Sequence, residues 1–102
     1  MNITGLLNTE YIGVYSFNEM LINGRALYLG ENKIYGMWFD GQMLNNADWI
    51  LGPISNLEVG KVTYGVLRSA GDMPCPSQTV IWSEYWIHGW KNNENANVQC
   101  IF

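Results

Sequence analysis

Short runs of β-branched and aromatic residues alternate with turn-forming residues along the whole chain. In residues 11–17, Tyr11, Tyr15 and Phe17 fall on one face of an extended strand, and Ile12 and Val14 fall on the other. This period of two is typical of strands in an antiparallel sheet. We expect about seven short strands, at residues 11–17, 25–29, 33–39, 49–51, 62–67, 80–88 and 98–102. The pattern predicts an all-β domain, either a small antiparallel sandwich or a flattened barrel.

The breaks between these runs have the residues of turns and loops. Asn23-Gly24 and Asp40-Gly41 are pairs that readily adopt the positive φ angles of a tight hairpin turn. Residues 30–33 are expected to form a slightly longer turn, and residues 52–53, 71–76 and 91–97 are expected to be loops. Residues 17–22 are compatible with one helical turn, which is too short to change the fold class.

One segment fits two structures. Trp82, Trp86 and Trp90 recur every four residues, which suits one face of a helix as well as one face of a strand. Residues 76–78 could even begin a helix. We favour a strand over residues 80–88, because the β-branched and aromatic residues there suit a pleated surface and Gly89 weakens a helix.

Length and composition narrow the class of protein. The 102 residues fit a single domain, and the hydrophobic fraction of 48% is enough for a core. Only 14% of the residues are charged, the net charge is −4, and the five basic residues are scattered singly. Since no basic cluster is available to neutralise phosphates, we expect no nucleic-acid partner.

The N-terminal residues and the apolar runs bear on membranes and secretion. No apolar run approaches the roughly 20 residues that a membrane helix needs, so no membrane insertion is expected. Residues 1–10 lack the basic start and long apolar stretch of a signal peptide. The signal of a secreted form would therefore be removed or lie outside this sequence. Asn2-Ile3-Thr4 fits the N-glycosylation pattern, which makes Asn2 a candidate glycosylation site.

Cys75 and Cys100 are the only two cysteines. If they are bonded, they close a loop of about 25 residues and stabilise the domain by roughly 3 kcal/mol, and the protein belongs in an oxidising compartment. The alternative is a pair of reduced, buried thiols. Two thiols and the single His88 fall short of the four ligands of a zinc site. Cys75 with His88 also lacks the local signature of a catalytic cysteine, so we expect no metal and no cofactor.

The order of several short motifs is informative as a set. They are Asn23-Gly24-Arg25-x-x-Tyr28, Asp40-Gly41, Trp49-Ile50-Leu51-Gly52, Gly71-Asp72-x-x-Cys75-Pro76, Trp82 and Val98-x-Cys100. This order resembles that of an uncharacterised small two-cysteine all-β module of extracellular multidomain proteins. The resemblance implies an extracellular, non-catalytic unit in which Cys75 and Cys100 are paired. It implies no particular binding residues.

Five tryptophans in so short a chain suggest a binding surface as well as a core. We expect Trp38, Trp49 and Trp82 to be buried, as is usual for aromatic residues of a small β domain. Trp86 and Trp90 are the candidates for an exposed platform that stacks on sugar rings. The amides of Asn92 and Asn93 follow closely in the sequence and would bond to sugar hydroxyls.

Other polar residues have weaker claims to a function. Arg25 could bind a carboxylate or sulfate, but a structural role is preferred, either paired with an acid or stacked on a tyrosine. The loop carboxylates match no calcium-loop spacing. Glu84 is the best single candidate for a glycoside hydrolase acid, although no second carboxylate is linked to it by sequence.

The sequence therefore predicts a non-catalytic extracellular or cell-surface module for adhesion or ligand binding. Its partner would be a glycan or a protein, and the candidate ligand-binding residues are Trp86, Trp90, Asn92 and Asn93. The alternatives are a structural spacer in a larger surface protein and, with less support, a small glycoside hydrolase that uses Glu84.

Overall fold

The computed structural model describes residues 1–41, 48–58, 60, 65–69, 76–78 and 81–99. Cys75 and Cys100, and with them the predicted disulfide, lie outside the described residues. The strands are β1 (Asn2–Thr4), β2 (Gly13–Ile22), β3 (Arg25–Gly30), β4 (Tyr35–Phe39), β5 (Trp49–Pro53), β6 (Leu67–Ser69), β7 (Trp82–Tyr85), β8 (Trp90–Asn93) and β9 (Asn97–Gln99). The described residues also include one short α-helix, α1 (Ser55–Glu58), and two 3-10 helices, η1 (Thr9–Tyr11) and η2 (Pro76–Gln78). The predicted all-β class is confirmed.

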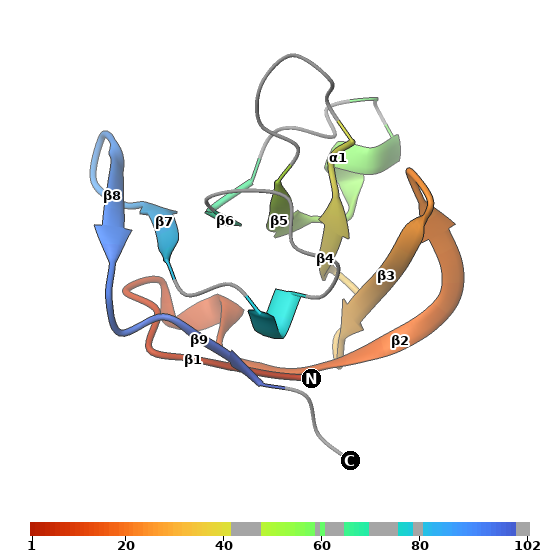
Figure 1. Cartoon of the computed structure of the whole chain (residues 1–102), viewed down its shortest axis with the longest axis horizontal. Helices are drawn as coiled ribbons and strands as arrows, with labels where there is room; N and C mark the ends of the chain where they lie inside the picture. The colour runs from red at the N-terminus through yellow and green to blue at the C-terminus, as the bar shows by residue number, and fades with distance from the viewer. Residues whose placement is uncertain (42–47, 59, 61–64, 70–75, 79–80, 100–102) are drawn as a thin grey trace.

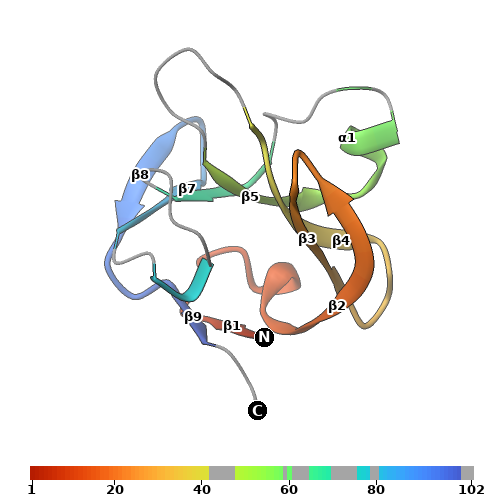
Figure 2. The same ribbon diagram turned by 45° about the vertical axis from the view of Figure 1, so that its right-hand side comes forward.

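The strands form one antiparallel sheet that curls around a common core (Figure 1). Its order is β8-β7-β6-β5-β4-β3-β2-β1-β9, so that neighbours in sequence are neighbours in the sheet until β9 returns to pair with β1. The architecture is a half-barrel, with β8 and β9 at the two ends of the described order (Figure 2). In the described part of the chain the strands number nine, so the expectation of about seven was wrong. The two additional strands are β1, near the N-terminus, and β8, in a segment expected to be a loop.

The β2–β3 hairpin turns where the sequence predicted. Ile22 pairs with Arg25, and Asn23 and Gly24 between them have φ angles of 53° and 84°. These left-handed values define the tight turn that the Asn-Gly pair favours. The longer turn at residues 30–33 is also confirmed, because the backbone N–H of Lys33 donates to the carbonyl of Gly30 at 2.9 Å.

The predicted tight turn at Asp40-Gly41 was wrong. Gly41 has a positive φ of 65°, but β4 and β5 pair at Phe39 and Trp49, so residues 40–48 connect the two strands. Asp40 instead continues the pairing, since its backbone N–H donates to the carbonyl of Asp48 at 2.9 Å.

Two further local predictions are corrected. Residues 17–22 form no helical turn, because β2 runs through them to Ile22. A bulge between Phe17 and Leu21, with Glu19 at a φ of 56°, breaks the regular alternation there. The strand predicted over residues 80–88 is confirmed for β7 only, and residues 76–78 form the 3-10 helix η2.

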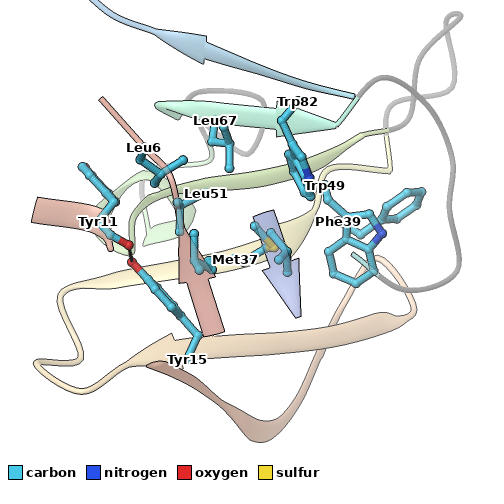
Figure 3. Packing of buried hydrophobic residues seen from close by; sticks show 11 residues of the cluster. Leu6, Tyr11, Tyr15, Met37, Phe39, Trp49, Leu51, Leu67 and Trp82 are labelled. Carbon is cyan, nitrogen blue, oxygen red and sulfur yellow. Dashed lines mark hydrogen bonds between the residues drawn. The ribbon is translucent and has the colours of Figure 1, made fainter. Parts of the chain in front are cut away.

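The main core fills the inside of the curl (Figure 3). It draws on both ends of the sheet and on its middle, and consists of Ile3, Leu6, Tyr11, Tyr15, Met37, Phe39, Trp49, Leu51, Leu67, Trp82 and Val98. A smaller cluster on the outer face of the sheet, formed by Leu27, Trp38 and Ile50, is covered by Ile54 and by Leu57 of α1. Trp38, Trp49 and Trp82 are all at most 1% exposed, which confirms that these three rings are core.

Two tyrosines in this core are linked. The Tyr15 hydroxyl donates to the backbone carbonyl of Tyr11 at 2.8 Å, as Figure 3 shows. Burial, reinforced by the neighbouring Tyr35, raises the pKa of Tyr11 from 10.0 to about 12. Burial also raises the pKa of Tyr15. The fold therefore favours both hydroxyls in their neutral form.

The loop after β1 is fastened to β7 and β8 near the other end of the sheet. The Glu84 carboxylate, only 1% exposed, accepts hydrogen bonds from the backbone N–H groups of Leu7 (2.9 Å) and Asn8 (2.7 Å). Asn93 Nδ2 donates to Glu84 Oε1 (2.7 Å) and to the Gly5 carbonyl (3.1 Å). These contacts close one side of the half-barrel and hold the β7–β8 hairpin in place.

Candidate binding face

The candidate face lies on the β7–β8 hairpin, which ends in an unusual two-residue turn. Tyr85 pairs with Trp90, and the backbone N–H of Trp86 donates to the carbonyl of Gly89 at 2.9 Å. Ile87 and His88 between them have left-handed φ angles of 45° and 69°. A β-branched residue is strained in that region, so the pairing of the strands imposes the turn against the preference of Ile87.

Two exposed aromatic rings stand side by side at the base of this turn. Tyr85 is 46% exposed and Trp90 is 41% exposed. Their ring centroids lie 5.7 Å apart and their planes are inclined by 73°, an edge-to-face arrangement. The pair is therefore a corner between two rings and differs from the flat platform that stacked tryptophans would make.

Polar side chains extend this surface across three strands. Arg68 of β6 pairs with Ser83 of β7, and Ser83 pairs with Asn92 of β8, so all three share the face that bears Tyr85 and Trp90. The Ser83 hydroxyl donates to Asn92 Oδ1 at 3.1 Å. We call Arg68, Ser83, Tyr85, Trp90 and Asn92 together the aromatic face.

Arg68 is fixed from two sides. Its Nε and Nη2 both donate to Asp48 Oδ2, at 3.0 and 2.6 Å. Its guanidinium carbon lies 5.5 Å from the centroid of the Trp90 ring. Asp48 is 3% exposed, whereas the Arg68 side chain is 33% exposed. A buried acid thus orients a half-exposed arginine beside an exposed aromatic ring.

The structure separates the four residues that the sequence proposed as a ligand-binding set. Trp90 and Asn92 share the aromatic face. Trp86 lies at the turn and is half-buried. Asn93 lies on the opposite face of β8, where its Nδ2 bonds to Glu84 and Gly5 and its Oδ1 accepts the backbone N–H groups of Asn95 and Ala96.

Tyr85, Ser83 and Arg68 were not predicted as members of this face. A strand over residues 80–88 hides the relation between Tyr85 and Trp90, because the two are neighbours only if the chain reverses at residues 87–88. The sequence contains no signal for this turn, because the two residues at its centre are neither glycine nor asparagine. Nothing in the sequence around Arg68 marks it as a member of this face, because it joins the face only through the pairing of β6 with β7.

The remaining candidate residues lie elsewhere. Glu84 is buried and bonded to backbone and amide donors, so its carboxylate does not face solvent. Asn2 is half-buried in β1, between β2 and β9, which is unlike the surface loops where glycosylation is usual. Arg25 stacks on Phe39, with its guanidinium carbon 3.9 Å from the ring centroid. His88 is exposed at the hairpin turn.

A shallow groove of about 250 Å³ forms a second surface feature, at the β2–β3 hairpin. Phe17, which is 56% exposed, is its main aromatic residue, and Glu31 and Lys33 stand at its rim. Within the described residues, no three His, Cys, Asp or Glu side chains are grouped so as to hold a metal ion, and no helix is long and apolar enough to cross a membrane.

Comparison with known proteins gives no relative. No family model matches the chain, and no curated protein or solved structure shows significant similarity to it. The case for a function therefore depends on the geometry of the aromatic face.

Proposed function

We propose that the chain is a non-catalytic extracellular module for adhesion or ligand binding, and that it binds glycans through the aromatic face. The observation that supports this most is the exposed Tyr85–Trp90 corner beside Arg68 and Asn92. Sugars present apolar C–H faces and hydroxyl edges, so they match an aromatic ring flanked by hydrogen-bond donors. Exposed rings without such donors would favour a purely apolar partner instead.

The face has the rigidity that a preformed site requires. Tyr85 and Trp90 are held opposite each other by strand pairing, and the Glu84 contacts fix the hairpin that carries them. Asp48 holds the Arg68 guanidinium. Because few side chains need to be ordered when a ligand arrives, the entropic cost of binding is small.

A glycan array with matched variants tests this function. We expect the wild-type domain to bind a subset of glycans, and Trp90→Ala and Tyr85→Ala to abolish that binding. Trp86→Ala should weaken it less, since Trp86 lies at the turn. Phe17→Ala is the control, because Phe17 is another exposed aromatic residue, on the β2–β3 hairpin. Circular dichroism of each variant verifies the fold.

The outcomes separate the proposal from its alternatives. Binding that is lost in Phe17→Ala and kept in Trp90→Ala would move the site to the groove at β2–β3. Absence of any glycan or protein ligand for the wild-type domain would favour a structural spacer within a larger surface protein.

The extracellular location depends on Cys75 and Cys100 and on the resemblance described above. Intact mass, with and without reductant and an alkylating agent, tests it on protein made under oxidising conditions. We expect no alkylation before reduction and two alkyl groups after it. Two free thiols under those conditions would remove the support for secretion.

A further inference from the structure

We propose that the aromatic face takes a single neutral pyranose residue, a terminal sugar or one unit of a chain, and discriminates against acidic sugars. This specificity rests on the proposed function, since it names the ligand class of the same face. Three features of the face lead to it: the angle between the rings, the charge around Arg68 and the free donors.

The angle between the rings limits how many sugars can stack. Tyr85 and Trp90 are inclined by 73° at a centroid distance of 5.7 Å. A pyranose that lies flat on one ring therefore meets the other ring edge-on. Two successive sugars of an extended chain would need two rings in roughly one plane. The corner fits one sugar ring.

The charge around Arg68 determines the preference for a neutral sugar. Asp48 Oδ2 lies 2.6 Å from Nη2 and 3.0 Å from Nε, so the charge of the arginine is already balanced by a buried carboxylate. A sugar carboxylate or sulfate would have to bind beside the Asp48 carboxylate, and among the described residues of this face Arg68 is the only cation. The net charge of −4 adds a general repulsion toward polyanions.

The remaining donors of Arg68 and Asn92 suit hydroxyl groups. Within the described residues, Nη1 of Arg68 and Nδ2 of Asn92 donate to no protein atom, while Asn92 Oδ1 is occupied by Ser83. Arg68 and Asn92 stand on either side of Ser83, in one row across three strands. Two fixed donors beside a ring are suited to two hydroxyl oxygens of one sugar.

The test measures affinity by titration with defined probes. The neutral probes are the methyl glycosides of glucose, galactose, mannose and N-acetylglucosamine, and the acidic probes are methyl glucuronide and sialic acid. We expect at least one neutral glycoside to bind tenfold or more tightly than either acid. We also expect its affinity to change less than twofold between 50 and 500 mM salt, since no net charge is exchanged.

A pair of variants assigns the role of Arg68. Arg68→Lys keeps the positive charge but loses the planar fork, and should weaken the neutral glycoside by about tenfold. Lys91→Arg, on the other face of β8, is the matched control and should leave the affinity unchanged. If Arg68→Lys does not fold, the acidic and neutral probes and the salt series on the wild-type protein still test the preference for a neutral sugar.

Two results would overturn this specificity in distinguishable ways. Tighter binding of an acidic sugar, with an affinity that falls as salt rises, would leave glycan binding in place and reject the preference for a neutral sugar. Binding of neither class, by the wild-type domain on the array or in titration, would reject the proposed function together with the specificity.

Discussion

The side chains of Glu84 and Asn93 meet across the β7–β8 hairpin, with Asn93 Nδ2 donating to Glu84 Oε1 at 2.7 Å. Each of the two also bonds to the loop after β1: Glu84 to the N–H groups of Leu7 and Asn8, and Asn93 to the carbonyl of Gly5. The pair thus replaces strand pairing with side-chain bonds at one side of the half-barrel. It is also what positions the hairpin that bears Tyr85 and Trp90.

Replacing Glu84 by glutamine should destabilise the domain. The amide brings an NH₂ group toward two backbone donors and the Asn93 amide, so at least one hydrogen bond to a buried charged group is lost. We expect the free energy of unfolding to fall by about 2 kcal/mol or more. Urea denaturation measures this. Glu94→Gln, at an exposed position, is the control and should change stability by less than about 0.5 kcal/mol.

The same variant also tests the alternative of a glycoside hydrolase. A structural Glu84 predicts a loss of stability in Glu84→Gln. Turnover of a glycoside panel by the wild-type domain, lost in Glu84→Gln while stability is unchanged, would contradict the non-catalytic interpretation.

Replacing Gly5 by a larger residue should destabilise the domain by more than its positive φ alone explains. Its φ is 78°, and a Cβ placed there would lie 1.8 Å from the carbonyl oxygen of Asn95. Gly24 has a similar φ of 84° and nothing within 4 Å of such a Cβ. We expect Gly24→Ala to cost about 1 kcal/mol and Gly5→Ala about 3 kcal/mol or more, by thermal or urea unfolding. Equal losses in the two variants would mean that the loop after β1 does not pack against residue 95 as described.

The sequence predicted the structure correctly where the backbone preference of the local residues agrees with the tertiary structure. Asn23-Gly24 prefers left-handed angles, and a tight turn is found there. At residues 87–88 the two disagree: Ile87 and His88 have no such preference, and the turn exists because Tyr85 pairs with Trp90. A prediction from local residue preferences therefore extends the strand through the turn and misses β8.

The candidate site shows the same limit. The sequence proposed Trp86 and Trp90 together as candidates for exposed rings and could not tell them apart. It also could not separate the roles of Asn92 and Asn93. Which of two adjacent amides faces outward depends on the register of β8. Asn93 is fixed by contacts to Gly5 and Glu84, which lie 88 and 9 residues away along the chain. No local pattern reports on such contacts.

Relieving the strained turn should stabilise the domain. The double variant Ile87→Asn with His88→Gly places the preferred residues of this turn type at left-handed positions. We expect a gain of about 1 to 2 kcal/mol, which corresponds to roughly 5 °C or more in melting temperature. Ile81→Asn, another exposed isoleucine outside the turn, is the control and should give no gain. A lower melting temperature for the double variant would show that Ile87 or His88 makes contacts that stabilise the hairpin.

Alkaline pH should unfold the domain through its buried tyrosines. The pKa of Tyr11 is about 12 in the folded state against 10.0 for a free tyrosine, because the buried hydroxyl resists ionisation. Below pH 10 both states keep the proton and the stability is complete. As the pH rises from 10 to about 12 the unfolded chain ionises first, so Tyr11 alone lowers the free energy of unfolding by about 2 kcal/mol.

Urea denaturation at several pH values from 8 to 12 measures how steeply the free energy of unfolding falls with pH, and Tyr11→Phe should make this slope shallower. An equal slope in wild type and Tyr11→Phe would contradict this role of Tyr11.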